Sequence, residues 1–127
     1  EPIRDVAVHG DQVIVLTTDH HAKGSGLRLL DLDGLFLRTI AAGRFRKPQA
    51  VAASHGRAFV VDEDDEDDYG TGNALYIIDI QSGDILQRLR IDLRDEVAAI
   101  CVDGDEIFIA GYTASKVFVL QYAGSEA

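Results

Sequence analysis

Short runs of apolar residues alternate with turn-forming residues along the whole chain. No window has apolar residues at the 3.6-residue spacing of an amphipathic helix. Instead, β-branched and aromatic residues fill the runs, and Gly, Asp and Ser separate them. The pattern therefore predicts an all-β protein.

Three segments share a more detailed pattern of one apolar run, a glycine turn and a second apolar run. They lie at residues 5–16, 51–61 and 100–110. Their turn glycines, Gly10, Gly56 and Gly104, are separated by 46 and 48 residues. Because glycine readily takes the positive φ angle of a tight reversal, each segment predicts a β-hairpin.

A second family of strand segments follows each hairpin, at 27–34, 74–83 and 116–124, and a further strand follows the first two, at 35–40 and 84–91. The unit is four strands in about 45 residues, the strand count and period of a β-propeller blade. We therefore predict one segment of antiparallel β-propeller, 1–127. Blade 1 spans about 1–44, blade 2 about 45–92 and blade 3 about 93–127, and the last blade lacks its outer strand.

Residues 45–83 carry the most specific form of the repeat. Its positions are Pro48, Val51, Ala52, Gly56, residues 59–62, Asn73, residues 75–79 and Gly83. This pattern resembles the NHL repeat, and the first unit is similar from Pro2 to Gly34. The third unit departs from it, with Gln121 where the others have Asp31 and Asp79. The resemblance implies a propeller that usually has six blades, in a family that includes protein-binding modules, RNA-binding modules and some metal-dependent lyases or hydrolases.

Three blades are fewer than the four to eight of closed propellers. Two explanations are open. The chain is a piece of a longer propeller whose further blades belong to the same parent chain, or two copies assemble head to tail into a six-bladed ring.

Composition and charge narrow the class of protein. With 46% apolar and 27% charged residues, the chain is expected to fold, and it has no apolar stretch long enough to span a membrane. We expect a soluble protein, in a compartment that the sequence leaves open. The lone Cys101 lies in an apolar run and is expected in the core.

Seven acidic residues in one run account for most of the net charge of −10. The remainder of the chain has 15 acidic and 12 basic residues, with no basic patch of the kind that binds phosphate backbones. A nucleic-acid partner is therefore not expected.

In propeller blades, the loops from second to third strands open on the same face as the links between blades, and ligands usually bind there. The loops here are 17–26, 62–73 and 111–115, and the links are 41–47 and 92–96. The second loop holds the acidic run, which we take with the next residue as a candidate binding site: Asp62, Glu63, Asp64, Asp65, Glu66, Asp67, Asp68 and Tyr69. The run is either a solvated loop, a weak site for Ca²⁺ or another divalent metal, or a docking site for a basic partner. It lacks the spacing of a calcium-binding loop.

Basic residues and histidines lie near this run in the predicted architecture. Arg44 and Arg46 are in the first link and either bind an anionic ligand or pair with the acidic residues. His20 and His21, together with Asp64 and Asp67, are candidate metal ligands. His9 and His55 precede turn glycines on the opposite face and are expected to be simple turn residues.

Three functions fit these observations. The first is a non-catalytic protein or peptide binding module that uses the face with the acidic loop. The second is part of a metal-dependent propeller hydrolase or lyase, and the third is a structural segment of a large repeat protein. No serine nucleophile elbow, Walker, dinucleotide-binding or HExxH motif is present, which argues against an enzyme.

Overall fold

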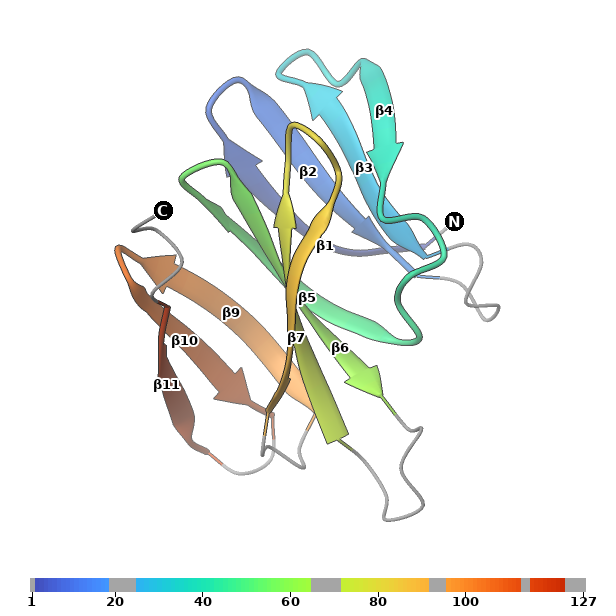
Figure 1. Ribbon diagram of the computed structural model, residues 1–127. Coiled ribbons are helices and arrows are strands. Elements are labelled where there is room, and N and C mark those ends of the chain that lie inside the picture. Colours follow the sequence, from blue (N-terminus) through green and yellow to red (C-terminus); the bar gives the residue numbers. More distant parts are fainter. Residues whose placement is uncertain (1, 19–24, 65–71, 92–95, 113–114, 123–127) are drawn as a thin grey trace.

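Three antiparallel sheets make up the computed structural model, which describes residues 2–18, 25–64, 72–91, 96–112 and 115–122 (Figure 1). The first sheet contains β1 (Ile3–His9), β2 (Gln12–Thr17), β3 (Gly26–Asp31) and β4 (Phe36–Ile40). The second contains β5 (Pro48–Ser54), β6 (Arg57–Asp64), β7 (Gly72–Asp79) and β8 (Ile85–Ile91). The third contains β9 (Val97–Asp103), β10 (Glu106–Gly111) and β11 (Val117–Gln121).

Each sheet has the sequential strand order of a propeller blade, and the first strands of the three sheets, β1, β5 and β9, lie side by side (Figure 1). The described residues include no helix, and hence no apolar helix that could cross a membrane. The all-β prediction of about three blades, the last with three strands, is confirmed for the described part of the chain.

Local chemistry explains the hairpins. Gly10, Gly56 and Gly104 have φ angles of 60°, 78° and 60°, as expected for the reversals between the first two strands. At the turn between β3 and β4, the Asp31 carboxylate accepts the backbone N–H groups of Asp33 and Leu35, each at 2.9 Å. Asp79 accepts that of Ser82 at 2.9 Å in the second blade. An aspartate before this turn therefore satisfies backbone donors that would otherwise need water.

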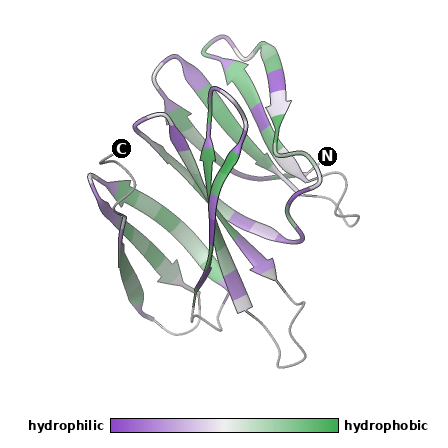
Figure 2. Cartoon of the chain, in the orientation of Figure 1, coloured by the Kyte–Doolittle hydropathy of each residue, from purple (hydrophilic) through white to green (hydrophobic). Residues whose placement is uncertain are grey.

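Two apolar layers hold the three sheets together. The first, between sheets one and two, includes Ile14, Leu16 and Leu29 on one side and Val51 and Val60 on the other. The second lies between sheets two and three. The middle sheet is therefore covered on both faces, and β7 is buried at every position except its last. Hydrophobic residues lie along the strands of each sheet (Figure 2).

Cys101 does not belong to the core, and that expectation is wrong. Buried and exposed positions intermix along β9, and Cys101 is exposed while its neighbour Ile100 is buried against the second sheet. An apolar run indicates a strand, but it does not indicate which of its two faces has a covering layer.

Candidate binding site on the loop-bearing face

Backbone hydrogen bonds tie the end of each second strand, or the residue after it, to the residue that precedes the first strand of the same blade. Glu63 N–H donates to Lys47 O at 2.9 Å, Thr18 N–H to Pro2 O at 3.1 Å, and Tyr112 N–H to Glu96 O at 2.7 Å. The three bonds are equivalent by position in the repeat. The loops and links therefore share one face, which we name the loop-bearing face.

Asp62 was expected in the acidic loop, but it lies in strand β6 and its residue is only 1% exposed. Its Oδ1 accepts the backbone N–H of Lys47 at 2.7 Å, and its Oδ2 accepts that of Arg46 at 3.1 Å. The carboxylate therefore holds the link between blades one and two, because it satisfies two donors of an irregular segment. The expectation that Asp62 lies in a loop is wrong.

Glu63 also belongs to β6 and is buried. Its Oε2 pairs with Lys47 Nζ at 3.1 Å, while the lysine side chain is 57% exposed. The expected pairing between the basic link and the acidic run therefore exists at this position. The strand ends at Asp64, so the loop between β6 and β7 is shorter than the sequence predicts.

The link itself is anchored by Phe45, which is fully buried and lies edge-on to Tyr76 with ring centroids 5.2 Å apart. Arg44 and Arg46, on either side of it, are exposed. The alternation follows from the anchor, because burying the aromatic ring directs its two neighbours outward. Both arginines belong to the link, and their role as binding residues stays a prediction.

The other candidates of the acidic run, Asp65, Glu66, Asp67 and Asp68, lie outside the described residues, as do Tyr69, His20 and His21. Asp64 closes β6, and its side chain also lies outside the description. Within the described ranges, no group of three or more His, Cys, Asp and Glu side chains is arranged to hold a metal ion.

A bulge near the start of the first strand of each sheet, which we call the innermost strand, was not expected from the sequence. The strand register shifts at Arg4, Gln49 and Ala98, which occupy the same position in β1, β5 and β9. Bulges re-aim side chains and are common next to functional sites. All three residues line one cavity of about 440 Å³, together with Asp5, Glu96, Val97 and Tyr112. We name this cavity the mouth.

Polar contacts fix the wall of the mouth. Arg4 Nη2 donates to Gln49 Oε1 at 3.2 Å, and Gln49 Nε2 donates to Lys47 O at 3.0 Å. Asp5 Oδ2 accepts the backbone N–H of Val51 at 3.0 Å and so connects the first two innermost strands. Tyr112, by contrast, is 71% exposed and is available to a ligand.

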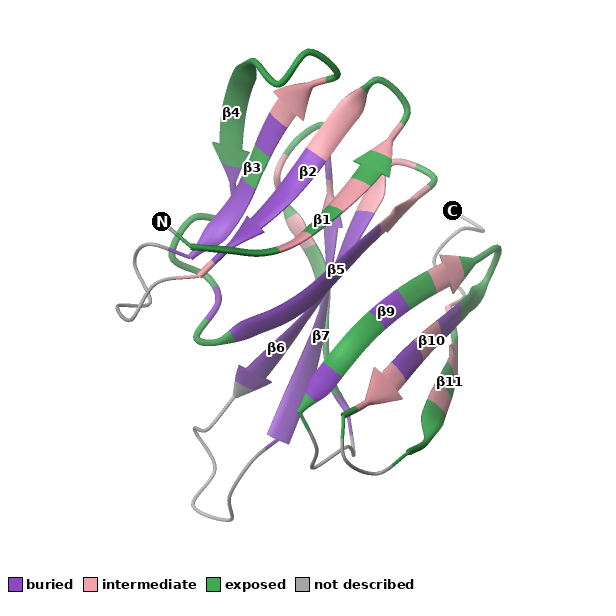
Figure 3. Cartoon of the chain, turned by 180° about the vertical axis from the view of Figure 1, so that it is seen from behind, coloured by how far each residue is buried: buried purple, intermediate pink, exposed green. Residues whose placement is uncertain are grey.

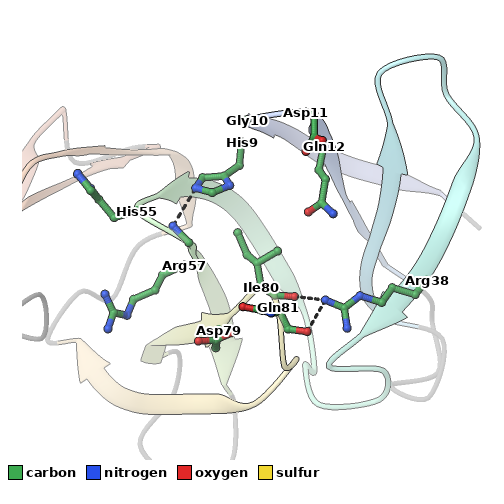
Figure 4. A pocket seen from close by; sticks show the side chains of 11 residues that line it. His9, Gly10, Asp11, Gln12, Arg38, His55, Arg57, Asp79, Ile80 and Gln81 are labelled. Atoms are coloured by element: carbon green, nitrogen blue, oxygen red, sulfur yellow. Dashed lines mark hydrogen bonds between the residues drawn. The ribbon is translucent and has the colours of Figure 1, made fainter. Parts of the chain in front are cut away.

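A second cavity of about 480 Å³ lies on the opposite face, between the turns of blades one and two (Figure 4). There His9 Nε2 accepts the backbone N–H of Gly56 at 2.8 Å, and Arg38 Nη2 donates to the backbone oxygens of Ile80 and Gln81. Both contacts join blade one to blade two. His9 is thus more than a turn residue.

His9 and His55 also differ in their place in the repeat. His9 is the last residue of β1, whereas His55 follows the end of β5 and lies within the turn, with a φ of 52°. Each histidine precedes a glycine, but the two turns are offset by one residue, so the two positions are not equivalent.

Asp79, also in this cavity, has a pKa below its ordinary value. The main cause is the hydrogen bond from the backbone of Ser82, and the Ser82 hydroxyl and the Arg57 charge act in the same direction, against a smaller opposing effect of burial. Its carboxylate serves the turn, since the same bond from Ser82 closes the hairpin.

Neither a protein-family model nor a curated protein matches the sequence. Among solved structures, the chain is similar to apo AztD from Citrobacter koseri, with 19% identity and a TM-score of 0.55 over 94% of this chain and 44% of that one. It is also similar to the computationally designed Ika4 protein, with 14% identity and a TM-score of 0.49 over 96% and 92% of the two chains.

The chain spans less than half the length of AztD, and the low identity means that the likeness concerns the fold alone. The sheet topology and this likeness define the class: a β-propeller-like scaffold of about three blades.

Proposed function

We propose that this chain is a non-catalytic binding module on a β-propeller scaffold of the NHL type, and that its loop-bearing face receives a protein or peptide with basic side chains. The observation behind this proposal is the cavity named the mouth. Equivalent bulges in three blades bring Arg4, Gln49 and Ala98 to one cavity of about 440 Å³. That volume is within the range of about 300–1,000 Å³ of ordinary ligand pockets.

The side chains of the mouth are suited to recognition. Tyr112 is 71% exposed and Arg4 is exposed beside it, and tyrosine and arginine are the residue types most often found as anchors of protein interfaces. Asp5 is less suited to a catalytic role, because its two carboxylate oxygens already accept the backbone N–H groups of Val6 and Val51.

The acidic run favours a basic partner. Lys47 O accepts hydrogen bonds from both Glu63 N–H and Gln49 Nε2, so one backbone oxygen joins the start of the run to the wall of the mouth. Five further acidic residues, 64–68, follow Glu63 in the sequence. Such clustered charge accelerates association with an oppositely charged partner and selects against acidic ones.

The NHL assignment is supported by the role of Asp62. It is the last of residues 59–62, which carry the resemblance, and it accepts two backbone N–H groups of the link. The turn glycines Gly34 and Gly83, with φ angles of 86° and 81°, match the pattern in the same way.

The test is a titration of fluorescein-labelled peptides, one rich in lysine, one in glutamate and one neutral, followed by fluorescence anisotropy. We expect binding of the lysine-rich peptide only, with an affinity that falls as salt is added. Replacing residues 65–68 with serine should weaken binding at least about 10-fold. Asp62 and Glu63 are kept in this variant because they are buried and support the link.

Two control variants make the test specific. The charge control replaces four aspartates on the opposite turns with serine: Asp11, Asp33, Asp84 and Asp103. It removes the same charge and should bind as the wild type does. Tyr112→Ala should weaken binding, whereas Leu32→Ala, a change at a similarly exposed residue on the opposite face, should not. Equal loss in both members of either pair would contradict the proposal.

A further inference from the structure

Both ends of the stack of sheets present exposed apolar surfaces. The first, which we name the β1 face, contains the apolar residues Val6, Val8, Val13, Leu30 and Phe36, of which Val13 and Leu30 are half-buried, and the exposed Arg28, which pairs with Val15. The second, the β9 face, consists of Ala99, Cys101, Phe108, Ala110, Val117 and Val119. Figure 3 shows exposed positions along β1 and β9, whereas β5 between them is almost entirely buried.

The repeat shows what normally covers such positions. Val6 pairs with Val15 as Val51 pairs with Val60, so Val6 and Val51 are equivalent. Val6 is 54% exposed, but Val51 is 3% exposed because the first sheet packs on it.

The same comparison holds at the other end. Val119 pairs with Phe108 as Ile77 pairs with Phe59, so Val119 and Ile77 are equivalent. Val119 is 53% exposed, whereas Ile77 is fully buried against the third sheet. Both open faces are therefore halves of a blade interface.

The two open faces are of different kinds in the repeat, and each internal layer pairs one of each kind. In the first internal layer, Leu29 lies on the side equivalent to the β9 face and Val60 on the side equivalent to the β1 face. In the second layer, Ile77 and Ile100 have the same two roles. Every interface in this chain therefore pairs one face of the β9 kind with one of the β1 kind.

We propose that a second copy of this chain covers both open faces, with the β9 face of each copy packed on the β1 face of the other. The two contacts are identical and close on themselves through a twofold axis, and together the copies supply six sheets, a number within the range of closed propellers. Burying exposed valines and a phenylalanine from water drives the association.

The solution mass of the 127-residue chain tests the proposal. By sedimentation equilibrium at about 50 µM, we expect twice the 13.8 kDa of one chain. Val8→Glu on the β1 face or Val119→Glu on the β9 face should each weaken association at least about 100-fold, because the ring would bury unpaired carboxylates. Both sites are exposed within one copy, so both variants should keep the wild-type circular dichroism spectrum. Leu86→Glu, on the outer strand of the middle sheet, adds the same charge and should leave the mass unchanged.

Mixing the two variants separates head-to-tail pairing from other modes. An equimolar mixture of Val8→Glu and Val119→Glu contains one intact pair of faces and should recover a two-chain species that neither variant forms alone. Cys101 lies on the β9 face, so its reaction with a thiol reagent should slow as the wild-type concentration rises. A wild-type monomer, or a Val8→Glu variant that still dimerises, would overturn the proposal.

Discussion

Replacing Asp62 with alanine removes the acceptor of two backbone hydrogen bonds, from Lys47 N–H at 2.7 Å and Arg46 N–H at 3.1 Å. Hydrogen bonds to a charged group contribute about 1.5–3 kcal/mol each, and two that share one carboxylate are not fully additive. We therefore expect the free energy of unfolding to fall by about 2–4 kcal/mol. For a chain of 127 residues this corresponds to a midpoint lower by roughly 7–15 °C.

Thermal and urea denaturation followed by far-ultraviolet circular dichroism measure this change. Asp62→Asn keeps one acceptor oxygen and should lose less than the alanine variant. Asp11→Ala removes an exposed carboxylate from the opposite face and should change the stability by no more than about 0.5 kcal/mol. If Asp62→Ala were as stable as Asp11→Ala, the carboxylate would not hold the link, and the structural role given to Asp62 would be wrong.

Three further changes test the packing and the turns. Phe45→Ala should lower the free energy of unfolding by about 3–5 kcal/mol in urea denaturation, because it empties a fully buried aromatic site. Gly83→Ala should lower the free energy of unfolding more than Gly34→Ala does in the same assay. Both glycines have positive φ, but only at Gly83 would the new Cβ approach within 3.1 Å of Ile40, which ends β4. Equal losses in the two variants would contradict this. Because the pKa of Asp79 is lowered, its contribution to stability is complete above its ordinary pKa and is lost as the pH falls through its folded value. The stability difference between wild type and Asp79→Asn should therefore shrink from pH 5 to pH 2, and a constant difference would refute the assignment.

The fold could be predicted because its signals are local. Each hairpin needs a glycine with positive φ between two apolar runs, and Gly10, Gly56 and Gly104 provide it at spacings of 46 and 48 residues.

The errors concern contacts between segments far apart in the sequence. A run of like charges is typical of a solvated loop. Asp62 and Glu63 nevertheless belong to a strand, because Lys47, 15 residues before Asp62, contacts both. Its backbone N–H donates to Asp62, and its ammonium group pairs with Glu63. Cys101 was placed in the core because the chain does not indicate which face of a blade is covered.

The mouth was missed for a related reason. Arg4, Gln49 and Ala98 are unlike residues, and only the strand register shows that they occupy one position in three blades. Aligning the repeats from the start of each first strand, instead of from the turn glycine, is the signal that could have found them.

The most direct test of the binding proposal is a map of the contact surface by nuclear magnetic resonance. Amide chemical shifts of the ¹⁵N-labelled chain would be followed during titration with the lysine-rich peptide. The account predicts the largest shifts at Arg4, Gln49 and Tyr112, around the mouth. Shifts centred on His9 and His55 at the opposite cavity, or no localised shifts at saturation, would contradict it.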